Sequence, residues 1–347
     1  MKTKKAIFEE VRAGGLRMRN RLVRSATWLG LAAPDGALPE EVFDVYRELA
    51  EGGVGAVVSG FASVMDEDRW FGGMARLSRD GLVPQWRRLA ETVHAGGAPL
   101  LAQLALGGFF PPDGRGEAVE PDGLSEADLA LVVRRFAEAA RRAAEAGLDG
   151  VQLHAAHFFF LSRFASPAAN HRTDGWGGST AGRARLLREI LAAVRAAAPG
   201  LAVWAKVNGC DYMPGGLEEE ESIALCRLLA EDGIDAIEAS GNGTSVAGVR
   251  AGCGEAYFLP FAARLAREVP VPVILVGGLR SREAMQGVLD GTDVELLSLS
   301  RPLLCEPDWP ERLRRGESDA SRCVSCNRCY STPGHRCAFR PREEGAR

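Results

Sequence analysis

The sequence lacks the features of a membrane protein and those of a nucleic-acid-binding protein. No apolar run within its 347 residues reaches the length that a membrane-spanning helix requires, and no signal-peptide core follows the basic N-terminus. The formal net charge is −4, and Lys and Arg are spread along the chain rather than gathered into a basic patch. We therefore expect a cytoplasmic protein that acts on a small molecule and binds neither nucleic acid nor a membrane.

The eight cysteines also lack the pattern of a disulfide framework. Four of them are scattered singly, whereas the other four, Cys323, Cys326, Cys329 and Cys337, lie close together near the C-terminus. In a large chain of the reducing cytosol, such a group is typical of metal or iron–sulfur ligation. The spacing leaves three interpretations open: an iron–sulfur cluster, a zinc ion, or no bound metal.

What the sequence does contain is a regular alternation of short apolar β-rich runs with helical patterns. Eight such units, with no second sheet implied, predict an α/β fold, namely a closed (β/α)8 TIM barrel over residues 1–317. An open, doubly wound sheet is the alternative. Residues 318–347 are expected to form a short Cys-rich tail that packs on the barrel or extends from it. The strands are predicted at 22–26, 54–60, 99–103, 149–154, 202–208, 235–240, 272–277 and 294–300, and the helices at 39–51, 84–96, 125–146, 180–198, 218–232, 258–268, 281–290 and 307–315.

Polar residues interrupt these strands near their C-terminal ends, which is where the active site of a TIM barrel lies. Gln103 ends the third strand, and His154 ends the fourth, with His157 three residues later. Lys206 lies within the fifth strand and faces the barrel interior, where a charge is costly unless an anion receives it. Two partners are open for this lysine: an anionic ligand, or an interior carboxylate such as Glu238.

Glycines and an arginine follow the last two strands. Gly277 and Gly278 come after the seventh strand, and Ser300 and Arg301 come after the eighth. Loops in these two places form the usual phosphate site of a TIM barrel, because their backbone amides are exposed. A glycine pair alone is a weak signal, but an arginine at the end of the next strand strengthens it. We therefore expect a phosphate-bearing ligand here.

Several longer motifs fall on at least six of the predicted strands. They are Asn20-Arg21-Leu22-Val23-Arg24-Ser25-Ala26-Thr27, Gln103-Leu104, the block from His154 to Ser179, Lys206-Val207-Asn208, Gly277-Gly278 and Ser300-Arg301-Pro302. In this order they resemble the old yellow enzyme family of flavin-dependent ene-reductases, over about residues 5 to 340. The tail from Cys323 to Cys329 resembles the iron–sulfur segment of the trimethylamine dehydrogenase and dienoyl-CoA reductase branch.

The resemblance implies a non-covalent FMN cofactor at the barrel mouth, NAD(P)H as the reductant, and a homodimer. By the same likeness, His154 and His157 hold the carbonyl oxygen of a substrate, and Lys206 stabilises the region of N1 and the C2 oxygen of the reduced flavin. The residues implied for the cofactor are Ser25, Ala26, Thr27 and Gly60 against the flavin, Gln103 at its pyrimidine edge, Lys206, and Gly277, Gly278, Ser300 and Arg301 around the phosphate.

Phe159 departs from the family pattern, because relatives carry at this position a tyrosine that protonates the substrate. A phenylalanine ring has no proton to donate. Three outcomes are open: protonation by solvent, protonation by another phenol such as Tyr212 or Tyr257, or a reaction that needs no such acid. Trp28 projects from the first loop, and we expect it to form an apolar substrate pocket with Phe159.

The favoured function is that of an FMN-dependent oxidoreductase that passes hydride from NAD(P)H to an activated alkene of the enone type. With one barrel in the sequence, nicotinamide and substrate are expected to use the same flavin face in turn. A flavin-dependent dehydrogenase, oxidase or isomerase that acts on a cyclic enone or an amine is the first alternative, and a flavin-binding protein with vestigial activity is the second. Dihydrouridine synthesis on RNA shares the barrel and the flavin, but it requires a basic surface that this composition lacks.

Overall fold

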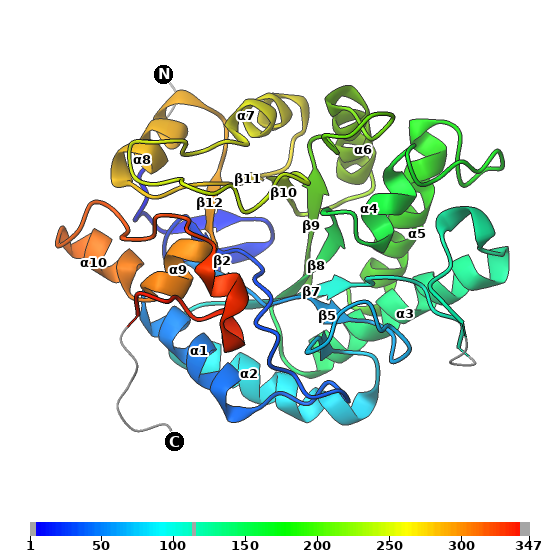
Figure 1. Ribbon diagram of the computed structural model, residues 1–347, viewed down its shortest axis with the longest axis horizontal. Coiled ribbons are helices and arrows are strands. Elements are labelled where there is room, and N and C mark those ends of the chain that lie inside the picture. Colours follow the sequence, from blue (N-terminus) through cyan, green and yellow to red (C-terminus); the bar gives the residue numbers. More distant parts are fainter. Residues whose placement is uncertain (1–4, 113–115, 341–347) are drawn as a thin grey trace.

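The computed structural model describes residues 5–112 and 116–340. Its main sheet is a ring of parallel strands, closed where β4 pairs with β7 (Figure 1). The TIM barrel predicted from the sequence is thereby confirmed, and the open sheet is excluded. The barrel strands are β3 (Leu22–Arg24), β4 (Ala56–Val58), β7 (Leu100–Ala105), β8 (Gly150–Ala155), β9 (Ala202–Asn208), β10 (Ala236–Ser240), β11 (Val273–Val276) and β12 (Leu296–Leu299).

Helices connect the strands and cover the outside of the barrel (Figure 1). Their starts follow the expected chemistry: Ser125 and Asp128 form a reciprocal capping box, and the Ser281 hydroxyl accepts a hydrogen bond from the N–H of Ala284 at 3.2 Å. The helices that follow the barrel strands are α1 (Glu40–Glu51), α2 (Val83–Ala95), α3 (Glu126–Glu145), α5 (Thr180–Ala197), α6 (Glu219–Glu231), α7 (Leu259–Glu268), α8 (Arg282–Gly291) and α10 (Trp309–Arg315).

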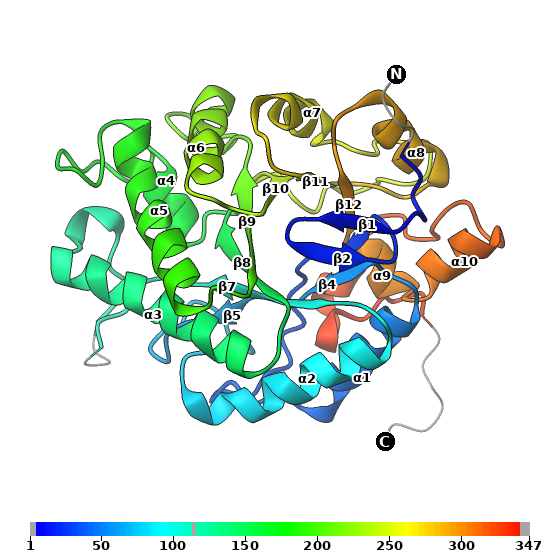
Figure 2. The same ribbon diagram turned by 180° about the vertical axis from the view of Figure 1, so that it is seen from behind.

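An antiparallel hairpin of β1 (Val11–Ala13) and β2 (Leu16–Met18) lies across the N-terminal end of the barrel (Figure 2). Its apolar side chains pack with the residues that fill the barrel interior, among them Trp204. The indole N–H of Trp204 donates to the carbonyl oxygen of Gly14 at 2.6 Å. The hairpin therefore closes the end of the barrel opposite the expected active site.

Several short elements were not predicted from the sequence. They are too short to show a period of 2 or 3.6 residues, so hydrophobic patterning does not reveal them. These elements are β5 (Ala62–Ser63), β6 (Ala75–Arg76), α4 (Phe160–Ala165), α9 (Arg301–Cys305), η1 (Asp80–Leu82), η2 (Pro121–Gly123), η3 (Arg328–Ser331) and η4 (Pro333–His335).

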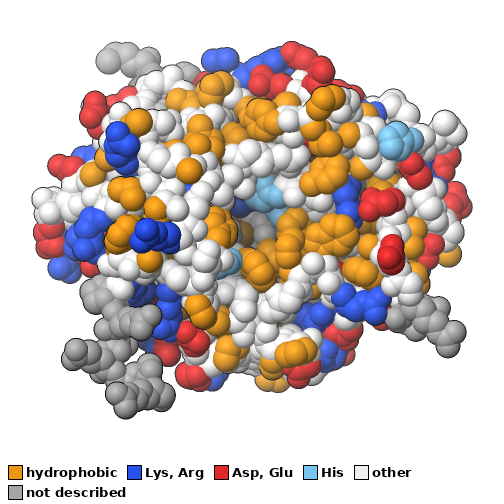
Figure 3. Space-filling model, in the orientation of Figure 1, with side chains coloured by type: hydrophobic (Ala, Val, Ile, Leu, Met, Phe, Trp, Pro, Cys, Tyr) orange, Lys and Arg blue, Asp and Glu red, His pale blue; other side chains and the backbone are white. Residues whose placement is uncertain are grey.

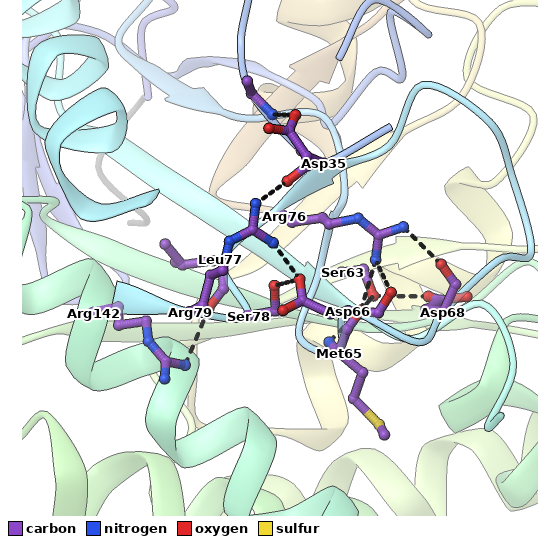
Figure 4. A network of polar contacts seen from close by, with 12 residues as sticks. Asp35, Ser63, Met65, Asp66, Asp68, Arg76, Leu77, Ser78, Arg79 and Arg142 are labelled. Atoms are coloured by element: carbon purple, nitrogen blue, oxygen red, sulfur yellow. Dashed lines mark hydrogen bonds and ion pairs between the residues drawn. The ribbon is translucent and has the colours of Figure 1, made fainter. Parts of the chain in front are cut away.

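The loop over residues 64–79 is braced by a buried polar network (Figure 4). Arg76 donates to the carbonyl oxygen of Asp68 at 2.9 Å, and the Asp68 carboxylate accepts from the Ser63 hydroxyl at 2.8 Å. Both charged side chains are buried, so each needs these partners to offset the loss of water. The network holds in place the loop that carries Phe71.

The described part of the tail packs on the barrel. The N–H of Arg282 donates to the carbonyl oxygen of Asp319 at 2.8 Å, and η3 and η4 then lie beside α9 (Figure 1, red). The boundary between residues 317 and 318 stays a prediction, and residues 341–347 of the predicted tail lie outside the described part. In that part of the chain, no helix is both long and apolar enough to cross a membrane.

Candidate active site

A cavity of about 1020 Å³, its open mouth included, lies at the C-terminal end of the barrel. Figure 3 shows the hollow near the centre of the face, with hydrophobic side chains around it and histidine inside. Loops that follow different strands meet there, as expected for this fold. Of the residues singled out in the sequence, the cavity is lined by Ser25, Ala26, Thr27, Trp28, Gln103, His154, His157, Phe159, Lys206, Tyr257, Gly277, Gly278, Ser300 and Arg301.

Lys206 is buried in the cavity wall and has two partners. Its ammonium group lies 3.2 Å from the Glu238 carboxylate and donates to the Ser25 hydroxyl at 2.8 Å. The Ser25 hydroxyl in turn donates to Glu238 at 2.8 Å. The interior carboxylate considered for this lysine is therefore its partner. Because Lys206 also lines the cavity, the same ammonium group is available to an anionic ligand.

Two amides extend this network along the barrel wall, from β10 to β8 and β7. The Gln152 amide donates to Glu238 at 2.8 Å, and the Gln103 amide donates to the Gln152 oxygen at 2.8 Å. The chain of hydrogen bonds fixes the Gln103 side chain and leaves its oxygen directed at no other described residue. Buried networks of this kind hold side chains in one arrangement, because each unpaired member is costly.

His154 and His157 form the polar part of the cavity wall, with ring centroids 5.1 Å apart. His157 Nε2 lies 2.8 Å from the Ser240 hydroxyl, whereas His154 Nδ1 is buried and has no hydrogen-bond partner. Burial, with a smaller contribution from the positive charge of Lys206, lowers the pKa of His157 to about 3. Burial likewise holds the pKa of His154 well below its usual value. Both rings are neutral at pH 7, so each keeps one N–H that can donate to a carbonyl oxygen.

The depressed pKa of His157 makes the stability of the protein depend on pH. The unfolded chain takes up a proton near pH 6.5, but the native ring does so only near pH 3. The contribution of His157 to stability is therefore complete above pH 6.5 and is lost as the pH falls towards 3, by up to about 1.4 kcal/mol per pH unit. In urea unfolding at pH 7, 5.5 and 4.5, the native protein should lose stability faster than the variant His157→Gln. Parallel losses would contradict the buried, neutral ring.

Phe159 belongs to an aromatic cluster at the rim of the cavity. Its ring lies 5.1 Å from Phe61, 5.5 Å from Phe71 and 4.4 Å from His154. Trp28 stacks on Phe61 at 5.9 Å. The apolar wall expected from Trp28 and Phe159 is therefore present, and two of its members, Phe61 and Phe71, were missed because they come from distant loops.

The two tyrosines considered as proton donors lie in different places. Tyr257 lines the cavity, but its ring packs against the backbone of Gly277 and Gly278. Tyr212 is 63% exposed and lies outside the cavity lining. Gly60 also lies outside the lining, and its N–H donates to the Tyr46 hydroxyl at 2.7 Å. The roles of Tyr212, Tyr257 and Gly60 stay predictions.

The other end of the cavity suits a phosphate. Gly277 and Gly278 have φ angles of 120° and 81°, in the region that favours glycine, and a side chain at Gly278 would meet the Tyr257 ring. Arg301 lines this end, as predicted, and so does Arg280, which was not predicted from the sequence. The sequence signal that could have indicated Arg280 is its position two residues after the Gly277-Gly278 pair. The glycine backbone and two arginines match the needs of a phosphate group.

The cavity as a whole fits FMN. One end has arginines for a phosphate, and the middle has a lysine and an amide fixed at its walls. The buried Ser298 hydroxyl lines the same cavity and has no hydrogen-bond partner, which leaves a polar atom for a ligand to satisfy. Ser25, Gln103, Lys206, Gly278 and Arg301 are thus the residues that would hold the cofactor.

The tail cysteines do not fit the metal site considered for them. A cluster or zinc ion needs several sulfur atoms that converge on one centre. Cys323 and Cys329 are buried, whereas Cys326 is exposed. Among residues 5–112 and 116–340, no group of three or more His, Cys, Asp or Glu side chains is arranged to hold a metal ion. An iron–sulfur cluster or zinc at Cys323, Cys326, Cys329 and Cys337 is therefore not supported.

A TIM barrel whose mouth joins two neutral histidines, an interior lysine and a phosphate end has the architecture of a flavin-dependent oxidoreductase. Comparison with known proteins agrees: residues 6–320 match the family described as NADH:flavin oxidoreductase / NADH oxidase. The chain belongs to this family, and the resemblance to old yellow enzyme is confirmed.

Three known proteins illustrate the relationship. The chain is 31% identical to the 4,4'-dithiodibutanoate disulfide reductase of Rhodococcus erythropolis, over 96% of this chain and 95% of the relative. It is 29% identical to a metal reductase of Desulforamulus reducens, over 92% of this chain but 50% of that protein. It thus spans about half the length of some curated relatives. The old yellow enzyme homologue from Zymomonas mobilis has the same fold, with a TM-score of 0.76, 21% identity, and coverage of 92% of this chain and 96% of that one.

Proposed function

We propose that this protein uses FMN to pass hydride from NAD(P)H to an activated alkene of the enone type. The observation that carries the proposal is the pair of neutral histidines in the cavity wall, with the buried Nδ1 of His154 unpaired. Two neutral imidazoles, each with one N–H, suit a carbonyl oxygen that gains negative charge as the alkene is reduced. When bound, FMN supplies the two-electron relay between nicotinamide and acceptor.

The residues around the histidines give the site its other properties. His157 is oriented by the Ser240 hydroxyl. The backbone N–H of His157 donates to Oδ1 of Asn208 at 3.0 Å. Lys206 places a positive charge at the cavity, partly neutralised by Glu238 beneath it. The aromatic rim excludes water from one side, which strengthens hydrogen bonds made inside the cavity.

The positions of the phenols support solvent as the source of the proton. Tyr257 packs at the glycine end of the cavity, and Tyr212 lies outside its lining. Tyr330 lines the cavity, but its hydroxyl is hydrogen-bonded to that of Ser245 and its ring packs on His335. We propose that solvent protonates the reduced alkene through the open mouth. Turnover of simple cyclic enones by the native protein is then slow.

A second acceptor class is favoured by Phe159. Reduction of a disulfide needs no proton on carbon: hydride breaks the S–S bond, one sulfur becomes a thiol, and the other leaves as a thiolate. The Rhodococcus erythropolis relative, which matches over 95% of its length, is named for a disulfide substrate, 4,4'-dithiodibutanoate. The amine alternative has less support, because the cavity lining contains Lys206, Arg280 and Arg301 but neither Asp nor Glu.

Separate measurement of the two half-reactions tests the proposal. FMN-loaded protein is first reduced with NADPH or NADH without oxygen, and then mixed with 2-cyclohexenone or with 4,4'-dithiodibutanoate. Reoxidation by the enone supports ene-reduction, and faster reoxidation by the disulfide supports the second candidate. If neither the enone nor the disulfide reoxidises the reduced flavin, the result favours a flavin-binding protein with vestigial activity. The homodimer and the cytoplasmic location remain proposals, based on the resemblance and on composition.

A further inference from the structure

The C-terminal tail contributes His335 to the wall of the cavity. The ring of His335 lies between Trp28 at 5.1 Å and Tyr330 at 5.4 Å, edge-on to both. Its Nδ1 is hydrogen-bonded to the carbonyl oxygen of Trp28, so Nδ1 carries the proton. His335 is 8% exposed, and its Nε2 makes no hydrogen bond to any described residue. The ring is therefore held on three sides, and Nε2 is the polar atom of this cavity-lining residue that has no partner among the described residues.

The tail adopts an unfavourable backbone where it meets the cavity. Ser325, Asn327 and His335 have φ angles of 50°, 60° and 51°, in the left-handed region that residues other than glycine seldom occupy. Each such residue costs on the order of 1 kcal/mol or more, and persists only where surrounding contacts hold it. Clusters of such residues are typical of ligand sites, where the contacts of their side chains hold the backbone in place.

Each of these strained residues makes a side-chain contact with the cavity wall. Ser325 accepts from Arg280 at 2.9 Å, and Asn327 accepts from Arg301 at 2.5 Å. The Asn327 amide also donates to the carbonyl oxygen of Ser245 at 2.8 Å, in a loop that borders the cavity. The tail is thus tied to the arginines at the phosphate end, and these ties set the position from which His335 reaches the cavity.

We propose that His335 binds an anionic group, such as a carboxylate, at the end of the acceptor remote from the reacting atoms. With Nδ1 held by the carbonyl oxygen of Trp28, Nε2 is the ring atom left for the anion, and the imidazolium form presents an N–H there. The charged residues of the lining are Lys206, Arg280 and Arg301, so a carboxylate meets no like charge. The acceptor is then an anion with an apolar body that fits the aromatic rim. This inference rests on the proposed function, because it assigns the acceptor to the same cavity.

Two matched acceptors test this role: 4-phenyl-3-buten-2-one, which is neutral, and the same enone with a para-carboxylate. Each is titrated into oxidised, FMN-loaded protein without nicotinamide, and binding is followed by the change in flavin absorbance. We expect the native protein to bind the carboxylate on the order of tenfold more tightly, as one charge-assisted hydrogen bond provides. His335→Phe should bring the ratio of the two dissociation constants to about one, with the neutral enone and FMN bound as before.

Two further variants complete the experiment. His335→Gln keeps an N–H donor and should retain part of the preference, and it also serves if the phenylalanine variant fails to fold. His171→Gln removes an exposed histidine that pairs with Asp122 outside the cavity lining, and it should change nothing.

The outcomes separate the two proposals. An unchanged ratio in His335→Phe, or no preference in the native protein, overturns the role of His335. Preferential binding without any reoxidation of reduced flavin overturns the proposed function and leaves His335 as an anion-binding residue. A protein that takes up no FMN overturns both.

Discussion

Phe159→Tyr is expected to raise the rate of enone reduction by about 10²-fold or more, because a positioned general acid typically contributes 10²–10⁴. The Phe159 ring lies 4.4 Å from His154, so a hydroxyl on it lies near the histidines that we propose hold the carbonyl group. Flavin reduction by NAD(P)H does not need this acid and should stay the same. The effect should therefore appear only when reduced protein is mixed with 2-cyclohexenone.

The neighbouring residue offers a matched control. Phe160 is fully buried and packs on Phe109 and Phe164 rather than on the cavity. Phe160→Tyr should leave enone reduction unchanged or impair folding. Reduction of 4,4'-dithiodibutanoate should not respond to Phe159→Tyr, since no carbon is protonated. Fast enone reduction by the native protein, with no gain in Phe159→Tyr, would show that another acid already serves the site.

Lys206→Met is expected to lower the midpoint potential of the bound flavin by roughly 30 mV or more, which corresponds to about 1.4 kcal/mol in a two-electron couple. The reason is electrostatic. The native wall presents Lys206 with Glu238 behind it, whereas the variant leaves a buried carboxylate without its cation. A negative charge disfavours the anionic reduced flavin, so reduction by NAD(P)H should also slow. Spectroelectrochemical titration of the loaded variant measures the shift.

Glu238→Gln is the matched opposite. It keeps the shape of the side chain and removes the negative charge, so the midpoint potential should rise. Breaking a buried ion pair from either side costs about 3–5 kcal/mol, and urea unfolding must show that both variants are folded. If folded, FMN-loaded Lys206→Met has the same flavin midpoint potential as the native protein, Lys206 does not act on the flavin.

Much of the fold could be predicted because long elements carry their own pattern. The barrel strands and most helices lie within a few residues of their predicted positions. The reason is that hydrophobic periodicity, a glycine after the end of a helix and an N-cap residue such as Ser125 are signals in the local sequence. The β1–β2 hairpin has no such signal. Its three-residue strands are defined by packing on Trp204, which is distant in the sequence.

The candidate site was predicted where a motif lies on one strand end, and missed where distant loops meet. His154, His157 and Lys206 converge because strand ends of one barrel face one cavity. His335 reaches the same cavity from the tail, and Phe71 packs on Phe61 and Phe159 at its rim from a braced loop; nothing in their local sequence indicates this. The Glu238 partner of Lys206 was considered from the strand pattern, because adjacent strands bring the two positions opposite each other.

The most direct test of this account is the visible spectrum of the purified, FMN-reconstituted protein before and after NADPH or NADH is added without oxygen. We expect stoichiometric FMN whose absorption bleaches on addition of one of the two nicotinamides. We also expect Arg301→Ala, which removes a cation at the phosphate end, to retain much less FMN. Protein that binds no FMN, or whose bound flavin stays oxidised with both nicotinamides, would contradict this account.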